Sequence, residues 1–158
     1  MCPTPADRLS QPQQIADLLL YRLYRLQATA GARVIRLCER EYGLTRREWR
    51  VLSFLSAHEG ALSSELADHA MLDRARTSRT LTRLDEKALI QRQPRPSDRR
   101  EVHVSLTAEG RRIAGELFSK VAEINHALMA GLSAIERQQL DALLVRLQAQ
   151  ADATASPA

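Results

Sequence analysis

The chain has 158 residues, a length typical of one domain with a hydrophobic core. Leucine and alanine are frequent and only 4% of the residues are aromatic, a composition that favours helices. No apolar run approaches the ~20 residues of a membrane-spanning helix, and the N-terminus lacks a basic and apolar signal pattern. We therefore expect a cytoplasmic protein. Two cysteines, Cys2 and Cys38, do not make a disulfide framework.

Positive charge is concentrated in one part of the chain. The net charge is +4, but residues 74–100 contain nine basic and three acidic residues, a local net charge of +6. All other residues together therefore sum to −2. A local excess of this kind indicates a polyanion bound by one patch.

Two helices are predicted before the basic stretch. Residues 1–11 are expected to form a mobile tail, and apolar residues at helical spacing predict one long helix over 12–42. A single small domain rarely buries so long a helix, which predicts contact with a partner subunit. Thr45 and Glu48 form a capping box that begins the next helix, with Trp49 facing inward.

Residues 63–107 predict a helix, a turn, a helix, a strand, a basic loop and a strand. Ser63 is expected to cap the first short helix, and Asp73 the second, over about 74–87. The strictly alternating residues 102–106 predict a strand that pairs with its predecessor across a Pro-rich loop. The second helix combines a small and apolar inner side, predicted as Ala75, Ser78, Leu81 and Leu84, with a basic outer side.

These elements make a winged helix-turn-helix over residues 43–106, within a mostly helical α+β fold. Residues 107–148 predict two more amphipathic helices, the second begun by a capping box at Ser133 and Glu136. Residues 149–158 are expected to be a mobile tail. We interpret 12–42 and 107–148 as one dimerisation module, with completion of a monomer core as the alternative.

Several motifs resemble the MarR family of bacterial transcription regulators. The most specific is Asp-Arg-Arg, three residues, Val, one residue, Leu-Thr, two residues and Gly, at residues 98–110. A weaker resemblance extends over about 13–150. Two positions depart from the pattern: Ala88 stands where the family usually has a helix-ending Gly, and Met71 where helix-turn-helix proteins often use Gly.

The two helices supply most of the candidate DNA contacts, because the N-terminal half of such a second helix enters the major groove. We predict that Arg74, Arg76, Thr77 and Thr80 reach base edges and that Ser63, Ser64, Arg79 and Arg83 reach phosphates. On the loop between the strands we expect Arg100 to enter the minor groove and Asp98 to hold the tip. Arg95 and Arg99 complete this basic loop.

The predicted function is that of a DNA-binding regulator, with repression favoured, acting as a homodimer on a palindromic operator. The resemblance further implies a small-molecule effector, often an aromatic acid, held between the dimer helices and the DNA-binding lobe. Its candidate lining combines aromatic and cationic side chains, namely Tyr21, Tyr24, Arg25, Arg33, Trp49, Arg50 and Arg112.

Other functions are less well supported by the sequence. It contains no Gly-rich phosphate loop, nucleophile motif or paired metal ligands, so we expect no enzyme, no cofactor and no metal site. Two alternatives stay open. One is a redox-sensing regulator that uses a cysteine, and the other is a winged-helix adaptor that binds proteins without DNA.

Overall fold

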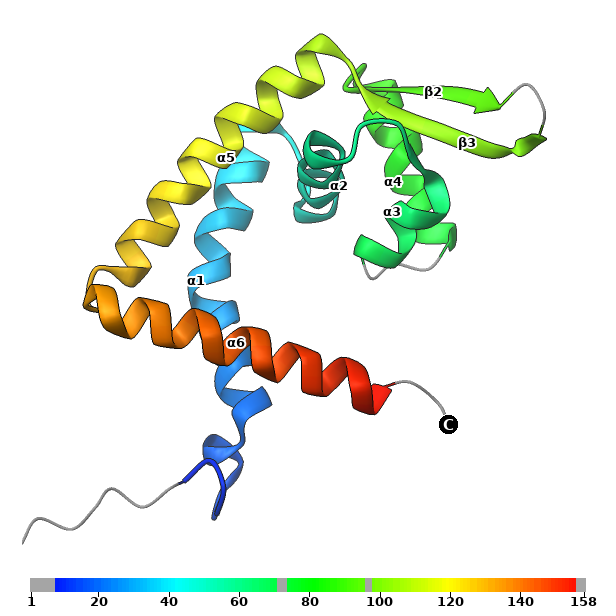
Figure 1. Cartoon of the computed structure of the whole chain (residues 1–158). Helices are drawn as coiled ribbons and strands as arrows, with labels where there is room; N and C mark the ends of the chain where they lie inside the picture. The colour runs from blue at the N-terminus through cyan, green and yellow to red at the C-terminus, as the bar shows by residue number, and fades with distance from the viewer. Residues whose placement is uncertain (1–7, 71–73, 96–97, 156–158) are drawn as a thin grey trace, which may run out of the picture. The chain divides into compact units, whose positions relative to one another are not determined.

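A computed structural model describes residues 8–70, 74–95 and 98–155 of the chain (Figure 1). The predicted cap Asp73 and the departure at Met71 lie outside this description. The chain forms two compact units, 1–121 and 122–158. In chain order the elements are η1 (Ile15–Asp17), α1 (Leu19–Tyr42), α2 (Arg46–Ala57), β1 (Ala61–Leu62), α3 (Ser63–Ala70), α4 (Arg74–Glu86), β2 (Ile90–Arg95), β3 (Asp98–Leu106), α5 (Ala108–Met129) and α6 (Ala134–Ala155).

The first long helix begins later than the sequence suggested. A short 3-10 turn, η1, comes first, and α1 starts at Leu19 rather than near residue 12. Asp17 explains the separate turn, because its carboxylate accepts hydrogen bonds from the Gln13 and Gln14 backbone N–H groups. The predicted end is confirmed: Gly43 adopts a left-handed φ of 60° that closes α1.

The first unit contains the winged helix-turn-helix fold (Figure 1). Its sheet is antiparallel in the order β1-β3-β2, and β2 and β3 form the predicted hairpin. The sequence did not reveal β1, which is only two residues long and pairs Ala61 with Val104. The predicted capping box of α2 is confirmed, since the Glu48 backbone N–H donates to Thr45 Oγ1 and the Thr45 N–H donates to Glu48 Oε2.

One hydrophobic core joins the helices to the sheet in this unit. Side chains from α1, α2, α3, α4, the hairpin and α5 are fully buried in it, including Cys38, Leu52, Leu66, Leu84, Val104 and Leu117. The core holds α4 against α2 and α3, and it holds the hairpin beside them. This packing fixes which side of α4 is left for other molecules.

The turn after α4 stores backbone strain at Ala88. Ala88 has φ 55°, the left-handed conformation that the glycine-based resemblance implied. Its N–H donates to Asp85 O and the next N–H donates to Leu84 O, so the turn is fully hydrogen-bonded despite its alanine. We expect Ala88→Gly to raise the free energy of unfolding by about 1 kcal/mol, because glycine has no Cβ penalty there. Urea denaturation at one fixed protein concentration measures the free energy of unfolding. A less stable Ala88→Gly variant would contradict the presence of strain at Ala88.

The second unit consists of the C-terminal end of α5 and the whole of α6. The capping box at Ser133 and Glu136 is confirmed, since each accepts a hydrogen bond from the other's backbone N–H. α6 continues to Ala155, so the tail predicted from residue 149 is helical over most of its length. Alanine and glutamine favour helix there, and Gln148 hydrogen-bonds Asp152 one turn later.

No side chain of α6 is buried over residues 134–154, where the structure describes them. Over the described residues, none of the helices is long and apolar enough to cross a membrane.

Candidate nucleic-acid interface

The outer face of α4 includes Ala75, Arg76, Ser78, Arg79, Thr82 and Arg83, all of which are exposed, as was predicted for Arg76 and Arg83. Thr77 and Thr80 were predicted to reach base edges, but they are only 2% and 7% exposed and point into the fold. Ala75 and Ser78 in turn were predicted to face inward and are exposed. The helix is therefore rotated relative to the sequence-based prediction.

The rotation has a physical cause in the threonine side chains. Burying a hydroxyl is tolerated when it is hydrogen-bonded, and Thr80 Oγ1 donates to the Arg76 carbonyl oxygen one turn earlier, at 2.9 Å. Thr77 and Thr80 thus extend the stripe of Leu81 and Leu84. If threonine is counted as a small apolar residue, the sequence predicts this buried side of α4.

Thr82 connects the outer face of α4 to the β2–β3 hairpin, which is the wing of this fold. The sequence did not predict this contact. Its hydroxyl donates to Ser78 O at 3.0 Å and accepts from Arg92 Nη2 at 3.2 Å. Arg92 lies on β2, and its Nε is 4.0 Å from Asp85 Oδ2 on α4. Arg92 therefore fixes the hairpin against α4 and orients the Thr82 hydroxyl.

The start of α3 differs from the prediction at Ser63. The Ser63 hydroxyl donates to Val102 O on β3 at 3.2 Å, so it connects the helix to the sheet rather than capping α3. Leu62 occupies the cap position instead, and its N–H donates to Glu65 Oε2 at 2.8 Å. Of the two serines predicted to reach phosphates, Ser64 is exposed and Ser63 is half-buried.

The wing tip is described by its backbone alone. Arg95 pairs with Asp98 across the end of the hairpin, with a register irregularity between Pro94 and Arg95. The structure describes only the backbone of Arg74, Arg95, Asp98, Arg99 and Arg100, and nothing of their side chains. Their predicted DNA contacts therefore stay predictions.

The residues predicted to line an effector pocket do not come together around the cavity of the first unit. This open cavity, about 690 Å³ in volume, lies between α1, α2 and α4, and Arg50 alone of the seven candidates lines it. Tyr24, Arg25 and Arg33 are exposed along α1, Tyr21 is half-buried there, and Trp49 packs against the core. The cavity is lined by Gln27, Ile35, Glu39, Thr45, Arg46, Arg47, Glu48, Arg50, Arg76, Arg79, Thr80 and Arg83.

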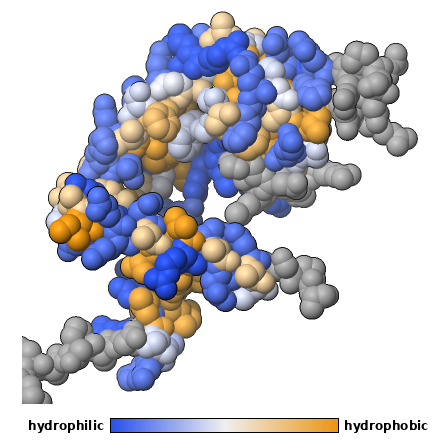
Figure 2. Space-filling view, in the orientation of Figure 1, coloured by the Kyte–Doolittle hydropathy of each residue, from blue (hydrophilic) through white to orange (hydrophobic). Residues whose placement is uncertain are grey.

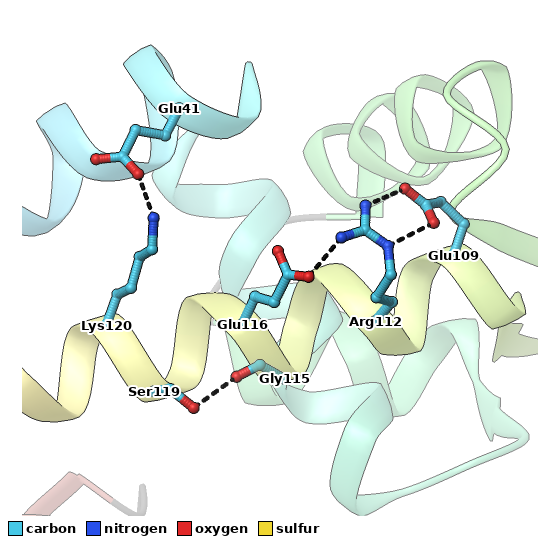
Figure 3. Close-up of polar contacts among 7 residues, drawn as sticks. All are labelled: Glu41, Glu109, Arg112, Gly115, Glu116, Ser119 and Lys120. Carbon is cyan, nitrogen blue, oxygen red and sulfur yellow. Dashed lines mark hydrogen bonds and ion pairs between the residues drawn. The ribbon is translucent and has the colours of Figure 1, made fainter.

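Arg112, another residue predicted to line the effector pocket, forms ion pairs on the surface of α5 (Figure 3). Its guanidinium lies between Glu109 and Glu116, with Nε donating to Glu109 Oε2 at 2.8 Å. The hydrogen bonds that the Arg112 guanidinium donates to Glu109 and Glu116 raise the pKa of Arg112, and those to Glu109 lower the pKa of that carboxyl group. Further along α5, Lys120 bridges to Glu41 of α1 (Figure 3).

Cys38 does not have the environment of a reactive thiol. It is 0% exposed in the core, and burial raises its pKa, which favours the protonated and unreactive form at neutral pH. Cys2 lies outside the described residues. Among the described residues, no group of three or more His, Cys, Asp or Glu side chains could hold a metal ion.

Comparisons with known proteins agree with this fold. Residues 42–101, which run from the end of α1 into β3, match the model of the MarR family. The homoprotocatechuate degradative operon repressor of Escherichia coli is 28% identical over 66% of this chain and 71% of its own length.

Solved structures extend the similarity to most of the chain. A probable transcriptional regulator from Pseudomonas aeruginosa is 31% identical, with 85% of this chain and 99% of the other covered and a TM-score of 0.69. The MepR–DNA complex of Staphylococcus aureus has the same fold, with a TM-score of 0.74 at 22% identity over 84% of this chain and 98% of the other. The chain belongs to the MarR family of winged helix-turn-helix transcriptional regulators.

Proposed function

We propose that this protein is a transcriptional repressor that binds a palindromic operator as a homodimer and is released by a small effector. The observation that carries the proposal is the outer face of α4, where hydroxyl groups and a guanidinium are exposed beside a basic hairpin. Helices of this kind donate to and accept from base edges in the major groove. Repression follows most simply, since a protein bound over a promoter blocks polymerase without further contacts.

The contacts with DNA are assigned from exposure. Ser78 and Thr82 are the hydroxyl groups placed to meet base edges, and Arg74 and Arg76 keep the base-reading role that the sequence predicts for them. Phosphates would be bound by Ser64, Arg79 and Arg83. Hydroxyl and guanidinium groups that bind phosphates position the protein on the duplex without reading the base sequence. Arg100, supported by Asp98, would enter the adjacent minor groove, and Arg95 and Arg99 would flank it.

Exposed apolar side chains support the homodimer. The N-terminal part of α1 and the segment before it leave Ile15, Leu18, Leu20 and Leu26 exposed, Leu20 by 79%. Figure 2 shows this part of α1 as apolar surface. On α6, Ile135, Leu143, Leu144, Val145 and Leu147 are also exposed. Apolar surface on this scale marks a protein interface, which we assign to a second copy.

Two alternatives are weaker. A cysteine-based redox sensor requires an accessible thiolate, whereas Cys38 is buried with a raised pKa. An adaptor that binds only proteins would have no use for the net charge of +6 that residues 74–100 carry. We expect peroxide treatment to leave DNA affinity unchanged, which would exclude the redox sensor, and DNA binding itself would exclude the adaptor.

Selection from a library of random DNA duplexes tests the proposal although the operator sequence is not specified. We expect enrichment of an inverted repeat whose half-site centres lie about one helical turn, ~10 base pairs, or a multiple of it apart. Such a repeat reflects the two-fold symmetry of a dimer. A library that stays random after repeated rounds would contradict the proposed function.

Arg79→Ala tests the phosphate contacts of α4. We expect it to weaken the selected duplex and a scrambled duplex by the same factor, and to reduce the slope of log affinity against log salt by ~1. Arg36→Ala on α1 removes the same charge from an exposed position away from α4 and should change neither quantity. Fluorescence anisotropy at several salt concentrations measures both. A loss confined to the selected duplex would instead make Arg79 a base-contacting residue.

A further inference from the structure

Six arginines line the open cavity between α1, α2 and α4 in the first unit. Arg46, Arg47 and Arg50 come from α2, and the other three, Arg76, Arg79 and Arg83, come from α4. The volume of about 690 Å³ is within the range of small-molecule sites. We call this site the arginine cavity.

Among the described residues that line the cavity, acidic side chains are fewer than arginines. Two carboxylates line the cavity, Glu39 and Glu48, and Glu48 is already engaged by Lys87 Nζ at 2.9 Å and by Thr45. Within the described ranges, Arg46, Arg47 and Arg50 form no ion pair, and the same holds for Arg83 on α4. Grouping like charges is unfavourable without a counter-charge, so the cluster points to an anionic ligand from outside the chain.

The chemistry of the lining selects the type of anion. Ile35 is the only apolar side chain among the lining residues, and none of them is aromatic. An aromatic acid with one carboxylate would therefore supply a single negative charge to a site lined by six arginines, and its ring would meet little apolar surface. Arginine binds carboxylate and phosphate groups through two parallel hydrogen bonds, so several arginines suit a ligand with several such groups.

We propose that the arginine cavity binds a compact anion carrying two or more carboxylate or phosphate groups, and that this ligand lowers the affinity for DNA. The second part rests on the proposed function. Arg76, Arg79 and Arg83 belong to α4, which also carries the outer face, so the ligand and DNA draw on the same guanidinium groups. The ligand differs from the predicted aromatic acid in its chemistry, and the cavity shares only Arg50 with the residues of the predicted pocket.

The site is tested first without DNA, by isothermal titration calorimetry with citrate, inorganic pyrophosphate and benzoate at constant ionic strength. We expect saturable binding of citrate or pyrophosphate at one site per chain and at least about tenfold weaker binding of benzoate, which offers one carboxylate. A preference for citrate or for pyrophosphate distinguishes a polycarboxylate from a phosphate ligand. Failure of both to bind, or equally good binding of benzoate, would overturn the site.

Two variants localise the binding. Arg50→Gln and the more exposed Arg47→Gln should each weaken the preferred anion by about tenfold, whereas Arg36→Gln, with the same change of charge outside the cavity, should not. Circular dichroism melting establishes that each variant is folded. If one of the two cavity variants does not fold, the other still tests the site. If Arg36→Gln weakens anion binding as much as the cavity variants do, the effect comes from the net charge of the protein, and the proposed site is overturned.

The regulatory part is tested by anisotropy with the selected duplex at the same ionic strength. A saturating concentration of the preferred anion should lower DNA affinity by about 5- to 150-fold, and saturating DNA should weaken the anion by the same factor, because linkage is reciprocal. Arg50→Gln should keep its DNA affinity and lose the response to the anion.

The outcomes separate the two proposals. Absence of DNA binding by the wild type would contradict the proposed function while leaving the calorimetric test of the cavity intact. Anion binding without any change of DNA affinity would overturn the regulatory part of this inference. Loss of DNA affinity in Arg50→Gln equal to that in Arg79→Ala would make the cavity part of the DNA contact surface and overturn it as a ligand site.

Discussion

Gly110→Ala is expected to destabilise the fold more than any other substitution considered for this protein. A Cβ at this position would lie 1.9 Å from Leu89 O and 2.9 Å from Leu89 C. Both are backbone atoms, so no side-chain rotation relieves the overlap, and α5 would have to move away from the start of β2. Thr107, which caps α5 as predicted, would be pulled from Ala88, to whose carbonyl oxygen its hydroxyl donates at 2.8 Å.

We expect the substitution to cost ~4 kcal/mol or more, a large part of the ~5–15 kcal/mol that stabilises a typical domain. Gly115→Ala is the matched control on the same helix. No atom lies within 4 Å of a Cβ built there, so the gain in helix propensity should stabilise the protein by up to ~1 kcal/mol. Urea denaturation followed by circular dichroism at one protein concentration compares the two. Similar stability of both variants would contradict the close approach of α5 to Leu89.

Lys87→Met is expected to have the second largest effect on stability. Glu48 is 1% exposed, and the Lys87 ammonium reaches both of its oxygens while also donating to Gly43 O at 2.8 Å. Removing one partner of a buried pair leaves the other charge buried without compensation. The Lys87 side chain is 37% exposed, so water replaces part of the lost interaction. We therefore expect a cost of ~2 kcal/mol.

Lys120→Met is the matched control, because the Lys120–Glu41 pair is exposed on both sides. Water and salt screen an exposed pair, so we expect this variant to lose clearly less stability than Lys87→Met. A double variant, Lys87→Met with Glu48→Gln, should recover part of the loss, since the amide keeps hydrogen-bonding capacity without a charge. Equal effects of Lys87→Met and Lys120→Met in urea denaturation would contradict the role of the buried pair.

The cost of Lys87→Met should depend on pH. Burial by itself raises the pKa of Glu48, but the Thr45 backbone hydrogen bond and Lys87 together lower it below the ordinary value. In the wild type, the stabilisation from Glu48 is therefore present above the unfolded pKa of ~4.3 and lost as pH falls through the lower folded value. Without Lys87, burial disfavours the charged carboxylate, and protonation relieves that penalty. The stability difference between the two proteins should shrink from pH 7 to pH 4.

The architecture was readable from local signals in the sequence. The capping boxes at Thr45 and Ser133, the cap at Thr107 and the helix-ending Gly43 each depend on residues within a few positions of one another. The alternation in 102–106 likewise fixes the strand of the wing. These patterns identify the elements because hydrogen bonding and periodicity act over short distances along the chain.

The orientation of α4 and the position of the cavity were not readable in the same way. Whether Thr77 or Ser78 faces inward depends on how α4 packs against α2 and α3, and threonine suits either environment. The contact between Arg92 and Thr82 joins a strand to a helix, and the arginine cavity requires α2 and α4 to lie side by side. Such long-range placement is set by the tertiary packing of the core, which a single sequence leaves undetermined.

The central claim is that this protein recognises one DNA sequence as a dimer, and a competition titration tests it most directly. Anisotropy of the labelled inverted repeat, competed by the same duplex or by a scrambled duplex of equal composition at ~0.15 M salt, gives the ratio of affinities. We predict a preference of about a thousandfold or more for the repeat, with two chains per duplex by light scattering. Equal affinity for the two duplexes, or one chain of 17.7 kDa per duplex, would contradict the account.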